Sequence, residues 1–108
     1  MRERAFVYIL TNANNTVLYV GMTNDIERRI GEHKAHLGSS FCRKYKVTKL
    51  VHLERFDRIV DAIAREKQLK AGPREKKMKL INGSNRLWQD LAYGLESAEV
   101  ASSLRSSQ

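Results

Sequence analysis

Two short runs of β-branched and aromatic residues near the start of the chain constrain the fold more than any other feature of this sequence. They cover residues 5–10 and 16–22, and a cluster of threonine and asparagine residues that favours a turn separates them. This pattern predicts a β-hairpin. If Thr11 pairs with Thr16 across a four-residue loop, the antiparallel register places Tyr8 directly opposite Tyr19. We therefore expect the two tyrosine side chains to be neighbours.

A helix is expected directly after the hairpin. Thr23 and Asn24 can cap its start near Asp25, where acidic side chains suit the helix dipole, and Gly38 is a suitable end. The predicted apolar stripe of this helix also carries two polar residues that would point inward. The stripe consists of Ile26, Ile30 and Leu37, and the polar residues on it are Arg29 and His33.

A third strand and a second helix follow a basic loop or short helical turn at residues 41–45. The strand covers residues 47–56, and Asp57 can cap the helix, which runs to Ala71. In this helix a carboxylate is the polar residue that would point inward. Glu66 falls on the apolar stripe formed by Ile59, Ala62, Ile63 and Leu69.

Pro73 opens a third helix, which is expected to run to about Ile81, where an Asn-Gly-Ser-Asn sequence breaks it. Trp88 is then expected to pin the end of the fold to the core. The remainder is rich in Ser, Ala and Glu and lacks bulky residues. We therefore expect one domain over residues 1–95 and a disordered tail over 96–108.

The polar residues on these apolar stripes are candidates for a functional site. A buried Arg, His or Glu is costly unless it is paired, so its helix either lines a cleft or holds a structural ion pair. A cleft is favoured because several such residues can converge. Arg29 and His33 from one helix and Glu66 from another can face one concave surface with the two hairpin tyrosines.

The excess positive charge of the chain is confined to one segment. The chain has 20 Lys and Arg against 12 Asp and Glu, and residues 41–79 contain 13 and 5 of these, which accounts for the whole net charge of +8. A localised basic patch indicates a polyanionic partner, although a solvated basic face is the plainer alternative. The candidate nucleic-acid contacts in this segment are Arg43, Lys44, Lys46, Lys67 and Lys70.

The sequence argues against membrane, secreted, disulfide-bonded and zinc-binding proteins. The apolar runs are far shorter than the roughly 20 residues that a membrane span needs, and the start of the chain does not resemble a signal peptide. We therefore expect a cytoplasmic protein without a membrane partner. The single cysteine, Cys42, cannot form an internal disulfide, and the three histidines are too scattered for a zinc site.

A series of positions along the chain follows one ordered spacing, with two triplets in the hairpin and polar residues in the helices after it. They are Phe6-Val7-Tyr8, Tyr19-Val20-Gly21, Arg29, His33, Glu66 and the closing run Asn85-Arg86-Leu87-Trp88-Gln89-Asp90-Leu91. This spacing resembles the GIY-YIG nuclease superfamily, and most closely its small stand-alone bacterial members, the UPF0213 or YhbQ-like proteins. Phe6 stands where the motif has its first glycine and Val20 where it has isoleucine, and both changes are conservative in a strand.

The resemblance implies an α+β fold, with a three-stranded antiparallel sheet flanked by helices, and hydrolysis of DNA phosphodiester bonds with one divalent metal ion, Mg²⁺ or Mn²⁺. Because the chain has no room for a separate DNA-recognition domain, such an endonuclease would have low sequence specificity or select a DNA structure, for example in repair or recombination.

The resemblance also implies roles for individual residues. Glu66 would hold the metal ion, since hard oxygen ligands suit Mg²⁺. Arg29 would clamp the scissile phosphate and stabilise the charge that develops on its oxygens. Tyr8 or Tyr19 would position the attacking water, and His33 would take a proton. Asn85, in preference to Asn82, would orient the substrate or water on the metal.

Two functions of other classes fit the same residues. In the first, the chain is a non-catalytic module that holds DNA or RNA in the same basic groove without cutting it. In the second, it is a structural domain that binds a partner, and its inward Arg29, His33 and Glu66 form a buried ion-pair network. A steep salt dependence of binding without cleavage would favour the first, and failure to bind any nucleic acid would favour the second.

Overall fold

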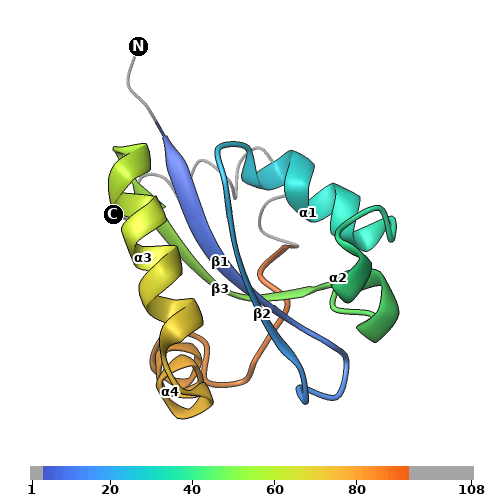
Figure 1. Ribbon diagram of the computed structural model, residues 1–108. Helices are drawn as coiled ribbons and strands as arrows, with labels where there is room; N and C mark the ends of the chain where they lie inside the picture. The colour runs from blue at the N-terminus through green and yellow to red at the C-terminus, as the bar shows by residue number, and fades with distance from the viewer. Residues whose placement is uncertain (1–3, 93–108) are drawn as a thin grey trace.

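The computed structural model describes residues 4–92 and confirms the α+β fold. Three antiparallel strands form a sheet in the order β2-β1-β3, and four helices flank it (Figure 1). In chain order the elements are β1 (Ala5–Thr11), β2 (Leu18–Thr23), α1 (Ile26–Lys34), α2 (Ser40–Tyr45), β3 (Lys49–Phe56), α3 (Ile59–Ala71) and α4 (Arg74–Ser84). No helix within the described range is long and apolar enough to cross a membrane.

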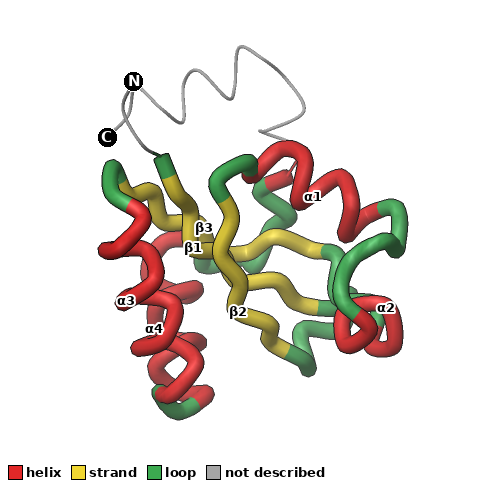
Figure 2. The backbone as a smooth tube through the Cα atoms, turned by 45° about the horizontal axis from the view of Figure 1, so that its top comes forward, coloured by secondary structure: helices red, strands yellow, loops and turns green. Residues whose placement is uncertain are grey.

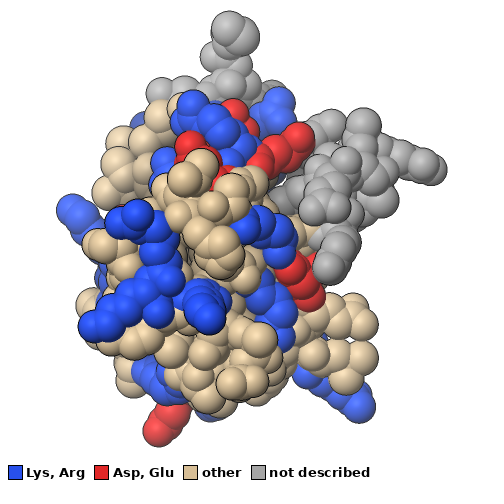
Figure 3. All heavy atoms as spheres, turned by 90° about the vertical axis from the view of Figure 1, so that its right-hand side faces the viewer, with Lys and Arg blue, Asp and Glu red and all other residues tan. Residues whose placement is uncertain are grey.

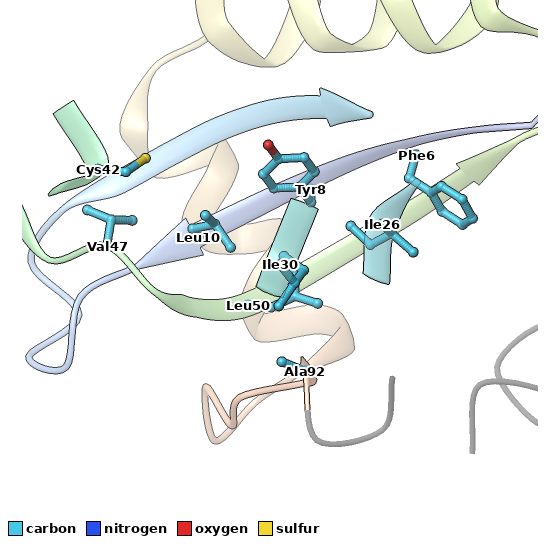
Figure 4. Close-up of a cluster of buried hydrophobic side chains, with 9 residues drawn as sticks. All are labelled: Phe6, Tyr8, Leu10, Ile26, Ile30, Cys42, Val47, Leu50 and Ala92. Atoms are coloured by element: carbon cyan, nitrogen blue, oxygen red, sulfur yellow. The ribbon is translucent and has the colours of Figure 1, made fainter. Parts of the chain in front are cut away.

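The central strand β1 is buried along its whole length because helices cover both faces of the sheet. On one face Tyr8 and Leu10 pack with Ile26 and Ile30 of α1 and with Cys42 of α2 in what we call the first core (Figure 4). On the other face, residues of β1 that alternate with these pack against α3 and α4 in the second core. Figure 2 shows the helices on the two sides of the sheet.

The predicted hairpin forms, but its register was predicted wrongly. Thr11 pairs with Leu18 rather than with Thr16, so Tyr8 lies opposite Gly21 and Tyr19 lies opposite Leu10. The loop is two residues longer because the Asn12 side chain accepts hydrogen bonds from the backbone nitrogens of residues 16 and 17, at 2.8 and 3.1 Å. A shift of two residues keeps the same face of the strand, so both tyrosines still lie on one side of the sheet.

Helix α1 is shorter than predicted. Its N-cap is Asp25, whose carboxylate accepts a hydrogen bond from the backbone nitrogen of Arg28, while Asn24 is exposed. The helix ends at Lys34, and His36 adopts a positive φ of 61°, which turns the chain before Gly38. Leu37 was predicted to lie on the apolar stripe, but the helix ends before it and its side chain is 72% exposed.

The later elements follow the prediction with shifted ends. The short helical turn forms as α2, and β3 begins two residues later than expected. Asp57 does not cap α3, because Arg58 occupies the N-cap position without a side-chain bond and Asp57 lies 3.6 Å from Arg55. Ile63, which was placed on the α3 stripe, is 37% exposed. Helix α4 continues three residues beyond its predicted end, to Ser84.

The segment after α4 returns to the sheet. Trp88 packs against the second core, and its indole nitrogen donates to Asn82 at 2.6 Å. The Asp90 carboxylate accepts a hydrogen bond from the backbone nitrogen of Leu50 at 3.1 Å and forms an ion pair with Lys34. The predicted domain end at residue 95 and the tail over 96–108 lie outside the described residues.

A network of polar side chains joins β3 to α3 and α4 across the second core. Arg65 binds both carboxylate oxygens of Glu54, at 2.8 and 2.9 Å. His52 lies 2.8 Å from the same carboxylate through Nε2 and 3.2 Å from Ser84 through Nδ1. Burial alone would raise the pKa of Glu54, but the hydrogen bonds from His52 and Arg65 and their charges lower it to about 2. Glu54 is therefore ionised at all ordinary pH values.

Candidate active site

Tyr8 is the buried centre of the candidate site. It lies on the central strand, is fully buried, and places its hydroxyl 3.5 Å from Nε2 of His33. Burial and the neighbouring Tyr19 raise its pKa to about 12, although the charge of Arg29 and a hydrogen bond from it oppose the shift. The Tyr8 hydroxyl therefore keeps its proton at neutral pH.

His33 stands between the two tyrosines. Its ring centroid is 6.0 Å from the ring of Tyr8 and 6.0 Å from that of Tyr19. Burial lowers the pKa of His33, as does the charge of Arg29, and Glu32 partly opposes them. The imidazole is therefore neutral near pH 7, as a general base must be.

The second ring nitrogen of His33, Nδ1, is buried and forms no hydrogen bond within the described structure. It faces Gly38, where an added Cβ would come within 2.4 Å of it. Gly38 therefore lets the imidazole ring pack directly against the chain at position 38, where any side chain would collide with it.

Arg29 lies one helical turn before His33 and is the cation of the site. Its side chain is 36% exposed, and its Nε is 3.2 Å from the carboxylate of Glu32 in an i,i+3 pair. Nε makes no hydrogen bond with good geometry despite this short distance. The guanidinium thus has one ion pair, with a partly exposed carboxylate that another anion can replace.

These residues line one cavity of about 190 Å³, which we call the candidate pocket. Three of the predicted site residues, Tyr19, Arg29 and His33, meet there, and Tyr8 lies buried behind His33. The full lining consists of Tyr19, Arg29, Glu32, His33, Leu37, Gly38 and Ser39. Glu32 was missed by the sequence analysis, and the only sequence signal for it is its opposite charge three residues after Arg29.

A row of aromatic rings extends from the pocket along α2. Tyr19 stacks on Phe41, with ring centroids 6.0 Å apart, and Phe41 lies 4.8 Å from Tyr45. Phe41 and Tyr45 are 43% and 42% exposed, which is unusual for large rings. Lys44 places its ammonium 5.4 Å from the Tyr45 ring. The sequence analysis did not identify this row.

The predicted basic contacts divide between two sides of the molecule. Arg43, Lys44 and Lys46 are exposed on or directly after α2, beside the aromatic row. Figure 3, which views the side of α1 and α2, shows Lys and Arg side chains gathered there. Lys67 and Lys70 are exposed on α3, which packs against the opposite face of the sheet. One basic segment of the sequence therefore forms two separate basic surfaces.

Glu66 is not among the residues that line the candidate pocket. Glu66 belongs to α3, and its Oε2 is 3.3 Å from the ammonium of Lys70. It makes no hydrogen bond or ion pair with a residue of the candidate pocket within the described chain. Within residues 4–92 no cluster of three or more His, Cys, Asp or Glu side chains is suited to hold a metal. A single carboxylate fits only a hard cation that takes most of its ligands from water and phosphate, as Mg²⁺ does.

Asn85 is also held away from the pocket. It is buried, and its amide nitrogen donates to the carbonyl oxygens of Val51 and Gln89 at 3.1 and 2.7 Å. Its side-chain oxygen accepts a hydrogen bond from the backbone nitrogen of Gln89 at 3.0 Å. These bonds fasten the segment after α4 to β3, so Asn85 stabilises the fold at this point.

Comparison with known proteins identifies relatives of this chain. Residues 4–79 match the protein family described as the GIY-YIG catalytic domain. A UPF0213 protein of Natronomonas pharaonis is 42% identical over 76 residues, which are 70% of this chain and 88% of the relative. A UPF0213 protein of Staphylococcus saprophyticus is 34% identical over 80 residues, which are 74% and 96% of the two chains.

A solved structure supports the fold as well. The solution NMR structure of a UPF0213 protein from Bacillus halodurans superposes with a TM-score of 0.53 at 28% sequence identity. The match covers 81% of this chain and 92% of the other.

Proposed function

Since the chain belongs to the GIY-YIG catalytic domain family, a family of nucleases, we propose that it is a metal-dependent endonuclease that hydrolyses phosphodiester bonds in DNA. The observation that carries this proposal is the meeting of Tyr19, Arg29 and His33 in one pocket, with Tyr8 behind them. A cation, a neutral imidazole and a hydroxyl around one cavity are the groups that phosphodiester hydrolysis needs.

In this proposal Arg29 binds the scissile phosphate. Its side chain lines the pocket, and its ion pair is with the carboxylate of Glu32. A phosphate displaces that carboxylate and receives charge-assisted hydrogen bonds from the planar donors of Arg29. These bonds strengthen as negative charge develops on the phosphate oxygens in the transition state.

His33 is the general base. Its low pKa keeps it neutral near pH 7, and its Nδ1 is unpaired on the side of Gly38. If Nε2 carries the proton, it donates a hydrogen bond to the Tyr8 oxygen, and Nδ1 is the basic nitrogen. Nδ1 then accepts a proton from the attacking water, directly or through Tyr19. Tyr8 is then a positioning residue, because it is buried, and Tyr19 is the tyrosine that contacts the substrate or water.

Glu66 is the carboxylate that would hold the divalent metal ion, Mg²⁺ or Mn²⁺, with water and the substrate phosphate as the other ligands. A bound metal ion would polarise the phosphate and stabilise the leaving oxygen. Before it can hold a cation, Glu66 must leave its pair with Lys70.

The surroundings of the pocket support a nucleic-acid substrate. The exposed rings of Phe41 and Tyr45 offer faces on which bases can stack, and Arg43, Lys44 and Lys46 lie beside them for the phosphates. These contacts do not read base edges, so we propose cleavage with low sequence specificity or with a preference for a DNA structure, in repair or recombination.

The direct test is cleavage of labelled single-stranded, duplex and branched DNA and of RNA, with Mg²⁺, with Mn²⁺ and with a chelator. We expect metal-dependent cutting by the wild type and its loss in Arg29→Ala and Glu66→Ala. Arg28→Ala is the matched control, since Arg28 is exposed on the same helix but does not line the pocket. Cutting that survives Glu66→Ala would refute the metal site, and cutting that survives Arg29→Ala would refute the pocket.

One observation favours a second function, a non-catalytic module that binds nucleic acid. Glu66 is not linked to the pocket by any hydrogen bond or ion pair in the described chain, so metal and pocket need not act together. Salt-dependent binding by the wild type, with all substrates left intact in both metals, would establish this function in place of the nuclease.

A further inference from the structure

A cavity with a basic lining lies between α3 and α4, away from the candidate pocket. It has a volume of about 330 Å³, and we call it the α3–α4 groove. Its floor includes Leu69 and Leu80, and its cations come from both helices. The complete lining is Arg65, Gln68, Leu69, Gly72, Lys76, Lys77, Lys79 and Leu80, with no acidic side chain.

The cations of the α3–α4 groove differ in how fully they are paired. Arg65 is held by Glu54 and Gln68, and Lys77 donates to the carbonyl oxygen of Gly72 at 2.8 Å. Lys76 and Lys79 are exposed, lie almost one helical turn apart on α4, and form no ion pair with any described residue. Two ammonium groups that repel each other on the rim of a groove are stabilised when an anion lies between them.

The spread of these groups fits an extended anion. The ammoniums are on flexible stems at separate points along α4, and no set of buried donors converges on a single point, as a small-anion site requires. A row of lysines beside a shallow apolar floor is instead suited to successive phosphates of a nucleic-acid backbone.

We propose that the α3–α4 groove is a second binding surface for the sugar–phosphate backbone of a nucleic acid, with Lys76 and Lys79 as its principal contacts. The groove is formed by helices that pack in the second core, whereas the candidate pocket is formed by residues beside the first core. The sheet therefore separates the two surfaces. The molecule therefore holds one segment of nucleic acid at the pocket and another at the groove. The proposal shares a nucleic-acid partner with the proposed function but does not depend on cleavage.

The test is equilibrium binding of labelled single-stranded and duplex DNA across a series of salt concentrations, in chelator so that nothing is cut. The variant Lys76→Ala/Lys79→Ala is compared with Arg4→Ala/Arg86→Ala, which removes two exposed charges that do not line the groove. We expect the slope of log K against log salt to fall by about 1.4 on single strands and about 1.8 on duplex in the groove variant only, since each phosphate contact contributes about 0.7 or 0.9. An equal change of slope in both variants, or no change, would overturn the proposal.

A second measurement locates the contact directly. In NMR titrations of the wild type with the same DNA, amide signals of residues 65–80 should shift together with those of the pocket, and in the groove variant only the pocket signals should shift. Shifts confined to the pocket in the wild type would also overturn the proposal. Failure of the wild type to cut DNA would refute the nuclease alone, because neither measurement involves cleavage.

Discussion

The ring of Tyr8 lies over Gly21 on the neighbouring strand, so closely that a Cβ at position 21 would be 2.4 Å from both Cζ and the hydroxyl oxygen. Gly21 is the last residue of the Tyr19-Val20-Gly21 triplet, and Tyr8 is the last of the first triplet. The absence of a side chain on one strand thus provides the space for the tyrosine of the next. Through this contact the two triplets together set where the Tyr8 hydroxyl meets His33.

Replacing Gly21 by alanine should therefore destabilise the fold. The new Cβ forces a rigid, fully buried ring to move, and such overpacking costs about 1–3 kcal/mol. Urea unfolding should show this loss for Gly21→Ala but not for Gly31→Ala, where nothing lies within 4 Å and a helical alanine is favoured. A smaller loss in a Tyr8→Leu background would confirm that the ring is the obstacle, and an equal loss would contradict it.

The Gly38→Ala variant should lose activity through His33. Its Cβ would come within 2.4 Å of Nδ1 and 2.7 Å of Cε1, so the ring of the proposed base must move. We expect cleavage to fall about 100-fold, the lower end of what a positioned acid–base group contributes. Gly83→Ala is the control, because position 83 has open space around it. The His33 ring signals in NMR spectra should move in Gly38→Ala, and unchanged signals would contradict the prediction.

The pH dependence of cleavage should report the pKa of His33. Because burial and Arg29 lower that pKa from its usual value near 6.5, activity should persist below pH 6.5 and fall only as pH drops through the lowered value. Glu32 raises the pKa of His33, so Glu32→Gln should move this acidic limb to still lower pH. NMR titration of His33 measures the same shift without turnover. The exposed Glu27→Gln is the control, and an upward shift in Glu32→Gln would refute the assignment.

Glu54 should make stability depend on pH in the acid range. Its pKa is about 2 in the fold against 4.5 when unperturbed, so the carboxylate stabilises the fold above pH 4.5 and loses this effect as pH falls toward 2. Glu54→Gln should cost about 2–3 kcal/mol at pH 7 and flatten the acid decline in the free energy of unfolding. Denaturant unfolding at several pH values measures both effects. An acid decline as steep in Glu54→Gln as in the exposed control Glu75→Gln would contradict this.

Much of the fold follows from local sequence patterns, but the hairpin register does not. The β-rich runs, the helical periodicity and the order of elements are all expressed within short windows of sequence. The register depends on two hydrogen bonds that the Asn12 side chain accepts across the loop, and a threonine–asparagine cluster is compatible with either loop length.

The candidate site was predictable in part for a similar reason. Arg29 and His33 share a helix face, which helical periodicity predicts. Tyr8 and Tyr19 lie on neighbouring strands and share a face of the sheet because the register differs from the predicted one by an even number of residues. Which face of the sheet α3 covers is a matter of chain connection, and no periodicity in α3 itself contains that information. The α3 sequence alone therefore did not determine how Glu66 is placed relative to Arg29 and His33, whose helix packs in the other core.

The aromatic row on α2 was missed because the helix is too short to show a period. Six residues make fewer than two turns, so Phe41 and Tyr45 do not form a recognisable stripe. The contact of Phe41 with Tyr19, which joins the row to the pocket, is between residues far apart in the sequence.

In the proposed nuclease, the pair between Arg29 and Glu32 has a consequence for turnover. Before a phosphate arrives, the guanidinium already has an anion of its own, so binding exchanges one carboxylate for one phosphate and gains only the difference between them. After cleavage Glu32 is still within reach and can replace the product at Arg29. A built-in competitor of this kind weakens the binding of substrate and product alike, and so limits product inhibition in an enzyme whose product carries the same charged group as its substrate.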